Sequence, residues 1–250
     1  MNVLLTVSYI GTRYCGWQVQ NNALSVQAVL QQALEKMLGR RYPLTGCSRT
    51  DAGVHARMFC CTVSTDEQAN AVPLDKWPQA VNPFLTDDIA VLKARQVPDS
   101  FHPRYDVIEK EYVYRIRNSS VRDPFAAGLV YLYPKRLDEE TMQKAAQAFV
   151  GKKDFTACMA QGSDVTDCVR DVKYLRVKRI GEEITIAIAA DGFLYNMVRI
   201  IVGTLIDVST GRIPLDELPA RIASRERSRM GFTAPACGLY LNKVRYQDDE

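Results

Sequence analysis

The chain has 250 residues, of which 47% are hydrophobic and 24% are charged. This composition is typical of a folded globular protein and excludes the disordered, collagen-like and coiled-coil classes. The length exceeds that of a common single domain, ~100 to 150 residues, and indicates one large domain or two smaller halves. The formal net charge is only +3, so total charge identifies no partner.

The N-terminal residues and the cysteines favour a cytoplasmic protein. Residues 1–11 lack the basic start and the cleavage pattern of a signal peptide. The longest apolar helix candidate, residues 197–208, carries two charges and falls short of the ~20 residues that a bilayer requires. Seven cysteines form no CxxC pair and only two histidines are present. We therefore expect reduced thiols and no metal.

The first part of the chain predicts a strand, a helix and further strands. A strand over residues 2–10 leads into a polar loop at 11–22. The clearest helix follows, because Ser25 suits an N-cap, Gly39 suits a C′ position, and apolar residues recur between them at three-four spacing. Further elements are predicted as strands at residues 41–47, 57–65 and 89–96, with a helix near 74–80.

The same pattern starts again after a proline-bracketed turn at residues 98–103. The strand predicted at 107–117 places Tyr112 and Tyr114 on one face, because successive side chains alternate. Asp138 is a good N-cap for a second helix. The remaining predicted elements are strands at residues 172–178 and 184–190 and a long helix at 194–208. We predict an α+β chain of two halves, residues 1–103 and 104–250.

A polar loop at residues 48–56, SRTDAGVHA, lies between two predicted strands. It places Arg49, Asp51 and His55 within seven residues, and active-site side chains are often carried on loops between rigid strands. The alternative is an ordinary connection, in which Asp51 accepts backbone N–H bonds, Gly53 supplies a positive φ and Arg49 is solvated.

Arg199 is a charged residue in an almost wholly apolar stretch. Its guanidinium must either reach the surface or pair with a buried anion. Asp51 is a candidate partner, and such a pair would hold the pKa of that carboxyl below its ordinary value. An oriented, ionised carboxylate suits nucleophilic or general-base chemistry.

Tyr112 and Tyr114 are preceded by Lys110 and followed by Arg115 and Arg117. Tyrosines on a strand are often ordinary core residues, but aromatic faces among cations also stack an extruded base, worth ~1 to 3 kcal/mol per base. Local basic clusters favour an RNA surface, although each alone also fits a solvated face. These clusters are Arg40 and Arg41, Lys152 and Lys153, residues 173–179, and Arg225, Arg227 and Arg229.

Taken together, these motifs resemble the tRNA pseudouridine synthase A family over essentially the whole chain. The matching segments are GTRYCGWQVQ at residues 11–20, RTDAGVHA at 49–56, FHPRY at 101–105 followed by Lys110 and YVY at 112–114, MVR at 197–199, and TAPACGL at 233–239. Two positions depart from the family pattern: Ser48 stands where many members have Gly, and Lys153 stands where His is more common.

The resemblance implies isomerisation of uridine to pseudouridine in the anticodon stem-loop of tRNA, at positions 38, 39 and/or 40. The target base would have to leave its stack to be reached. Asp51 would be the catalytic residue. The implied substrate-binding residues are Tyr112, which stacks on the uracil, Arg49, which contacts the target nucleotide or RNA backbone, Arg199, which partners Asp51, and Leu239, which closes the pocket.

The resemblance also implies two similar α+β halves joined into one largely antiparallel sheet, with the active-site cleft across its middle. It implies a homodimer that uses no metal or cofactor. It leaves open whether Asp51 attacks C1′, attacks the ring or acts through a glycal. Two other hypotheses stay open: a non-catalytic RNA-binding or RNA-folding protein on this scaffold, and a pseudouridine synthase with another RNA target.

Overall fold

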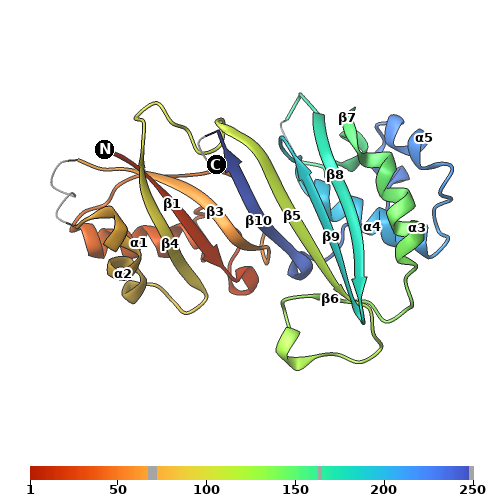
Figure 1. The fold of residues 1–250 in the computed structure, drawn as a ribbon, viewed down its shortest axis with the longest axis horizontal. Coiled ribbons are helices and arrows are strands. Elements are labelled where there is room, and N and C mark those ends of the chain that lie inside the picture. The colour runs from red at the N-terminus through yellow and green to blue at the C-terminus, as the bar shows by residue number, and fades with distance from the viewer. Residues whose placement is uncertain (67–71, 163–164, 248–250) are drawn as a thin grey trace. The chain divides into compact units, whose positions relative to one another are not determined.

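The computed structural model describes residues 1–66, 72–162 and 165–247, and the chain divides into two compact units (Figure 1). The first unit contains Met1–Ile108 and the C-terminal segment from Tyr240 onward, and the second contains Glu109–Leu239. The sequence predicts one division after residue 103. In the structure the C-terminal strand β10 (Leu239–Tyr246) instead pairs with β3 (His55–Ser64) of the first unit.

The first unit is built on a mostly antiparallel sheet. Its strands follow the order β4-β1-β3-β10, and β2 pairs with β3. The pairing of β3 with β10 is parallel, whereas the other pairings in this unit are antiparallel. The bounds of the strands not yet given are β1 (Asn2–Tyr9), β2 (Leu44–Gly46) and β4 (Ile89–Val97). The predicted strands are thus present, with β2 shorter than predicted.

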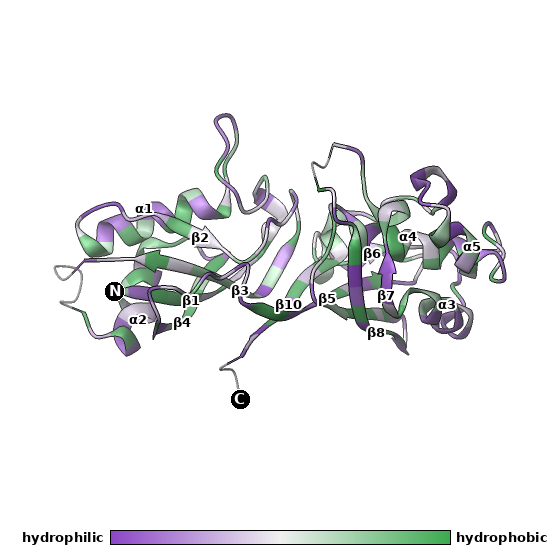
Figure 2. Ribbon diagram, turned by 90° about the horizontal axis from the view of Figure 1, so that it is seen from above, coloured by the Kyte–Doolittle hydropathy of each residue, from purple (hydrophilic) through white to green (hydrophobic). Residues whose placement is uncertain are grey.

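Helix α1 (Val26–Leu38) of the first unit has the predicted ends. The Ser25 hydroxyl accepts a hydrogen bond from the Ala28 N–H at 3.2 Å, and Gly39 ends the helix in the left-handed region at φ 76°. Leucines on one side of α1 are buried in the unit's core, and the helix lies on one side of the strands (Figure 2). The short helix α2 (Trp77–Val81) continues a 3₁₀ turn and packs on β4.

The strands of the second unit also pair mostly in the antiparallel direction. Its strands follow the order β5-β9-β8-β7, with antiparallel pairing throughout this path. A short strand, β6, pairs with β5 in parallel. The bounds are β5 (Val107–Arg117), β6 (Tyr131–Leu132), β7 (Gly151–Asp154), β8 (Val169–Ile180) and β9 (Glu183–Ala190). The α+β class and the largely antiparallel pairing are confirmed.

Three helices accompany the strands of the second unit: α3 (Glu139–Ala146), α4 (Met197–Ser209) and α5 (Leu218–Ala223). Asp138 caps α3 as predicted, because its carboxylate accepts hydrogen bonds from the N–H groups of Glu140 and Thr141. Helix α4 is buried along most of its length and is largely hydrophobic in Figure 2. It packs against α3, which in turn packs on β8.

Helix α4 begins three residues later than predicted, because Asn196 adopts the left-handed conformation at φ 59° and separates the preceding turn from the helix. Helix α5 and strands β6, β7 and β10 were not predicted. Within the described ranges, no helix has the length and apolar character needed to cross a membrane.

Candidate active site

The loop that carries Asp51 joins β2 to β3 and is held from both sides. Thr50 is buried, and its hydroxyl lies 2.8 Å from the Tyr9 hydroxyl on β1. The Thr50 carbonyl accepts from the Trp17 N–H at 3.2 Å, and the Asp51 carbonyl accepts from the Val54 N–H at 3.1 Å. Asp51 itself is partly exposed. The backbone on each side of this carboxylate is therefore fixed by hydrogen bonds.

Glycines allow the preceding segment, residues 11–17, to lie directly against this loop. Gly16 has a φ of +83°, and a Cβ there would lie 2.3 Å from the Thr50 carbonyl oxygen. A Cβ on Gly11 would lie 1.9 Å from the Val54 carbonyl oxygen. Both distances are shorter than any Cβ contact in a folded protein, so only glycine fits at positions 11 and 16.

The Arg, Asp and His of the loop occupy three different environments. Arg49 is exposed, Asp51 is partly exposed, and His55 is fully buried at the start of β3. The His55 Nδ1 accepts a hydrogen bond from the Gly11 N–H at 3.0 Å, and its ring centroid lies 4.6 Å from that of Tyr240. His55 therefore ties the loop to its neighbours, whereas Asp51 presents a carboxylate at the surface of its unit. Gly53 has the predicted positive φ, 79°.

The ionised carboxylate of Asp88 holds residues 13 and 14, which lie in the segment packed against the Asp51 loop. The Tyr14 hydroxyl donates to Asp88 at 2.6 Å, the Arg13 Nε lies 3.3 Å from the same carboxylate, and the Tyr14 carbonyl accepts from the Gly53 N–H at 3.2 Å. Burial alone would raise the pKa of Asp88, but hydrogen bonds from Thr86 and Tyr14 and the Arg13 charge together lower it. Asp88 is thus linked through Tyr14 to the Asp51 loop.

The second unit gathers the aromatic candidates beside α4. Tyr112, on β5, is 6% exposed and meets Phe193 edge to face at a centroid distance of 5.0 Å. Tyr114 is fully buried, and its hydroxyl donates to the Pro235 carbonyl at 2.7 Å. Burial raises the pKa of Tyr114, and the nearby Arg199 charge opposes that rise. Tyr114 is therefore a neutral core residue beside Arg199.

Arg199 lies on α4 and is fixed by acceptors of its own unit. Its Nε donates to the Ala234 carbonyl and its Nη1 to the Asn196 side-chain oxygen, both at 2.7 Å. The Ala234 N–H returns a bond to the Arg199 carbonyl at 3.0 Å. Arg199 is half-buried, and these bonds hold its guanidinium within the second unit instead of leaving it extended into solvent.

Leu239 follows a segment that is pressed onto the same aromatic core. It is 5% exposed, and a Cβ on the preceding Gly238 would lie 2.6 Å from the Tyr114 ring. The structure thus gathers Tyr112, Arg199 and Leu239 around Tyr114 within the second unit, while Arg49 and Asp51 share one loop of the first. The pairing of Asp51 with Arg199 stays a prediction.

Sequence reasoning missed four residues that position the candidates: Tyr9, Thr50, Asn196 and Phe193. Asn196 had a usable signal, since an Asn directly before an apolar helix is typical of an N-terminal boundary. The Tyr9 to Thr50 contact joins residues 41 positions apart, and no local pattern indicates it.

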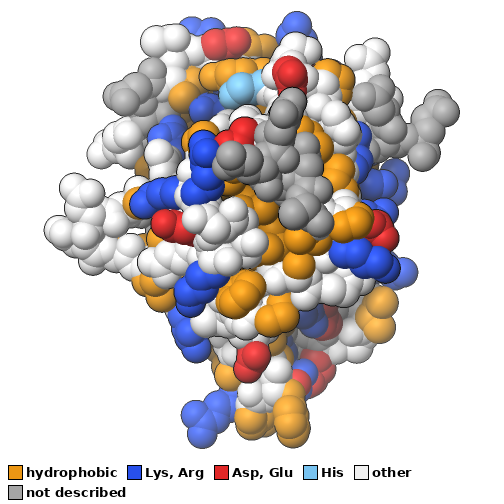
Figure 3. All heavy atoms as spheres, turned by 90° about the vertical axis from the view of Figure 1, so that its left-hand side faces the viewer, with side chains coloured by type: hydrophobic (Ala, Val, Ile, Leu, Met, Phe, Trp, Pro, Cys, Tyr) orange, Lys and Arg blue, Asp and Glu red, His pale blue; other side chains and the backbone are white. Residues whose placement is uncertain are grey.

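Many residues of the predicted basic clusters have structural partners. The Arg40 and Arg225 guanidinium groups pair with Asp66 at 2.7 Å and Asp154 at 2.9 Å. Arg179 is largely buried and pairs with Glu139 at 2.7 Å. On the face shown in Figure 3, Lys and Arg side chains lie at separate places among apolar and uncharged ones. These clusters alone therefore do not define an RNA-binding surface.

Among the described residues, no group of three or more His, Cys, Asp or Glu side chains is placed to hold a metal ion. All seven cysteines are described, and all are thiols outside disulfide bonds.

The fold and these residues define an α+β protein with a carboxylate on a rigid strand connection and an aromatic and arginine cluster beside a buried helix. The model of the tRNA pseudouridine synthase family matches residues 5–106 and 145–247. The chain belongs to that family, whose members are isomerases that act on tRNA.

Curated relatives agree with this assignment. A tRNA pseudouridine synthase A of Thermoanaerobacter pseudethanolicus is 44% identical over 245 residues, which cover 98% of this chain and 99% of the relative. One from Bacillus pumilus is 40% identical over 99% of this chain and 100% of the relative. A chain of a solved Cbf5-Nop10-Gar1 complex aligns with this one at a TM-score of 0.38 and 10% identity, and the alignment covers 97% of this chain and 59% of that chain.

Proposed function

We propose that this tRNA pseudouridine synthase isomerises uridines of the anticodon stem-loop, at positions 38, 39 and/or 40, with Asp51 as its catalytic residue. The observation that carries the proposal is the rigid Asp51 loop. Its backbone is held by Trp17 and Val54 and its neighbour Thr50 by Tyr9, so the partly exposed Asp51 side chain projects from a fixed backbone position. Preorganised charge of this kind suits chemistry at a carbon centre.

The reaction moves one bond and needs no oxidant or energy source. The uridine must be turned out of its stack, because neither its glycosidic bond nor its ring is accessible inside it. The N1–C1′ bond breaks, the uracil rotates, and C5 bonds to C1′; C5 then loses its proton while N1 gains one, so the product is an isomer. Asp51 acts by attack on C1′, by attack on the ring, or by removing a sugar proton to form a glycal.

The other assigned residues bind the flipped nucleotide or orient the carboxylate. Tyr112 offers a ring whose orientation is set by Phe193, and it stacks on the uracil. Arg199, held by Ala234 and Asn196, partners Asp51 and keeps it ionised. Leu239 closes the pocket beneath the base. The exposed Arg49 contacts the target nucleotide or the RNA backbone.

We further propose that the protein works in the cytoplasm as a homodimer that binds tRNA without a small-molecule cofactor. The cytoplasmic location is supported by the cysteine thiols and by the tRNA substrate of the family. The homodimer is supported by the resemblance to the A family.

The test is incubation of the purified protein with unmodified tRNA transcripts, followed by mapping of pseudouridine at single-nucleotide resolution. Three transcripts, each with uridine at only one of positions 38, 39 and 40, assign the target. We expect product at one or more of these positions with the wild type and none with Asp51→Ala. Product elsewhere in the tRNA would overturn the target assignment, and undiminished product with Asp51→Ala would overturn the catalytic one.

A further inference from the structure

A recess in the second unit is lined by none of the residues assigned above. It has a volume of about 380 Å³ and is open to solvent. Its lining residues are Tyr131, Tyr133, Pro134, Lys135, Arg212 and Phe232. Three of them are aromatic and two are cationic, and among these lining residues none is acidic. We refer to this site as the Tyr131 recess.

The aromatic rings of the recess continue the aromatic core beside α4. The Tyr131 ring lies 5.9 Å from that of Tyr133 and 6.5 Å from that of Tyr114, both in edge-to-face geometry. Strand β6 places Tyr131 opposite Ile116 of β5, and paired residues of adjacent strands point to the same face. Tyr131 therefore shares a face with Tyr112, four residues or roughly 13 Å along β5.

The cations of the recess are placed at its rim. Asp207, only 9% exposed, pairs with the Arg212 Nε at 2.8 Å, while 58% of the Arg212 side chain stays exposed. The Arg212 Nη2 lies 3.5 Å from the Tyr133 hydroxyl. The ion pair thus anchors one edge of the guanidinium and leaves much of the group accessible. Lys135 is exposed and adds a second positive charge.

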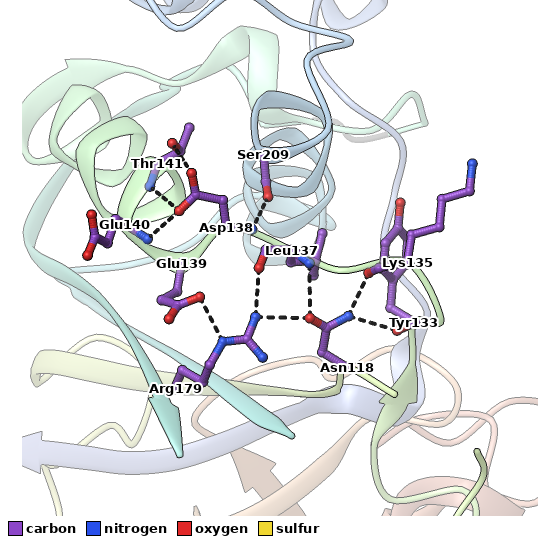
Figure 4. Close-up of polar contacts among 10 residues, drawn as sticks. All are labelled: Asn118, Tyr133, Lys135, Leu137, Asp138, Glu139, Glu140, Thr141, Arg179 and Ser209. Carbon is purple, nitrogen blue, oxygen red and sulfur yellow. Dashed lines mark hydrogen bonds and ion pairs between the residues drawn. The ribbon is translucent and has the colours of Figure 1, made fainter. Parts of the chain in front are cut away.

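A buried polar cluster holds the backbone of the recess in place (Figure 4). Asn118 donates from its side-chain nitrogen to the Tyr133 carbonyl at 2.9 Å and to the Lys135 carbonyl at 2.7 Å. Its oxygen accepts from the Leu137 N–H at 3.0 Å and from Arg179 at 2.9 Å. The Lys135 side chain extends away from this cluster in Figure 4. The recess is therefore preformed rather than assembled on binding.

We infer that the Tyr131 recess binds one nucleotide of the bound tRNA, with the base against its aromatic rings and the phosphate at Arg212 and Lys135. Base stacking on aromatic rings and phosphate contacts from Arg and Lys are the usual means of holding unpaired RNA. This inference rests on the proposed function, because it places the recess and Tyr112 on the same RNA. Roughly 13 Å spans about four stacked nucleotides at ~3.4 Å each, so the occupant is a near neighbour of the isomerised uridine.

The stacking contact is tested by measuring the Kd for tRNA with Tyr131→Leu, which keeps an apolar side chain and removes the ring. Phe84→Leu, at a half-exposed aromatic position of the first unit, is the matched control. We expect Tyr131→Leu to weaken tRNA binding by about 5- to 150-fold, the range for loss of one stacked base. Binding by Phe84→Leu should equal that of the wild type.

The phosphate contact is tested by the salt dependence of the same Kd. Lys135→Gln should lower the slope of log Kd against log salt by ~0.7 to 0.9, the change expected when one phosphate is no longer neutralised. Lys36→Gln, at an exposed position on α1, is the matched control and should leave the slope unchanged. Both lysines are exposed, so circular dichroism should show that both variants fold like the wild type.

The outcomes separate this inference from the proposed function. Wild-type tRNA affinity and salt slope in Tyr131→Leu and Lys135→Gln would overturn the recess assignment, even if pseudouridine forms at the proposed positions. A wild type that binds tRNA through the recess but makes no pseudouridine would overturn only the function. A third experiment is titration of the protein with UMP. If the wild type binds UMP at micromolar Kd, and Tyr131→Leu abolishes that binding but leaves tRNA affinity unchanged, the recess binds a free nucleotide and the inference is overturned.

Discussion

The hydroxyl groups of Tyr9 and Thr50 lie 2.8 Å apart in the interior of the first unit, and Thr50 directly precedes Asp51. The two residues are 3% and 7% exposed. Strand β1 therefore holds the residue next to the proposed catalytic carboxylate through a buried hydrogen bond. Such a contact sets the position of Asp51 without touching the substrate.

Tyr9→Phe removes the Tyr9 hydroxyl from this bond, while the Thr50 hydroxyl stays buried. We expect a loss of ~1 to 3 kcal/mol in unfolding free energy. We also expect a lower kcat with little change in KM, because the loop becomes less well positioned after binding. Urea unfolding and steady-state kinetics measure the two effects.

Tyr42→Phe is the matched control, since Tyr42 is buried in the same unit and its hydroxyl donates to Asp66 at 2.6 Å, away from the loop. It should lose stability with kcat unchanged. Equal kcat values in Tyr9→Phe and Tyr42→Phe would show that the Tyr9 contact is structural only.

Gly16→Ala should disrupt the site because a Cβ would lie 2.3 Å from the Thr50 carbonyl oxygen, at a φ of +83°. Gly39→Ala has a similar φ, +76°, but its Cβ would meet no atom within 4 Å. We expect Gly39→Ala to cost ~1 kcal/mol from the backbone conformation alone, and Gly16→Ala to cost more and to lower activity. Thermal unfolding and pseudouridine formation compare them; equal effects would contradict the packing argument.

Asp88 predicts a pH dependence of stability. Its pKa in the folded state is lowered, so the ionised form stabilises the fold above the unfolded-state pKa of ~3.9, and this contribution is lost as the pH falls through the folded-state pKa. Asp88→Asn should therefore be less stable than the wild type at pH 7, by ~1.5 to 3 kcal/mol for a charged hydrogen-bonded group. The difference should shrink below about pH 4. Urea unfolding from pH 3 to 8 measures it, and a difference independent of pH would contradict the assignment.

The proposed pairing of Asp51 with Arg199 predicts an interaction energy in a double-mutant cycle. Asp51→Asn, Arg199→Gln and the double variant should have unfolding free energies that depart from additivity by ~0.5 to 3 kcal/mol. The bonds of Arg199 to Ala234 and Asn196 are absent from both the single and the double variant, so they cancel in the cycle. Additivity to within ~0.3 to 0.5 kcal/mol would exclude the pair.

Local patterns predicted the elements whose ends are set by adjacent residues. Ser25 and Gly39 bound α1, Asp138 caps α3, and the bounds of β5 match the prediction, because capping and side-chain alternation act over a few residues. Strand β10 escaped prediction because its place beside β3 depends on distant residues, such as His55, which pairs with Tyr240.

The candidate site was harder to predict than the helices and strands. The role of each side chain depends on how deeply it is buried, and the sequence does not show that burial. The cluster of Arg49, Asp51 and His55 indicated an active-site loop, yet His55 is a buried acceptor for the Gly11 N–H. The partners of Arg199 in its own unit, Ala234 and Asn196, include a backbone carbonyl 35 residues away. The sequence also placed Arg40 and Arg225 in basic clusters, because it does not show which cations are paired. In the fold each of these side chains forms an ion pair with an aspartate.

The catalytic role of Asp51 is tested by a single-turnover assay of the wild type and Asp51→Asn with tRNA, which measures the pseudouridine formed, together with the tRNA Kd of each protein. Asp51→Asn keeps the shape of the side chain and removes its charge. We expect a Kd close to that of the wild type and no detectable pseudouridine. Pseudouridine formed by Asp51→Asn at the wild-type rate would contradict it.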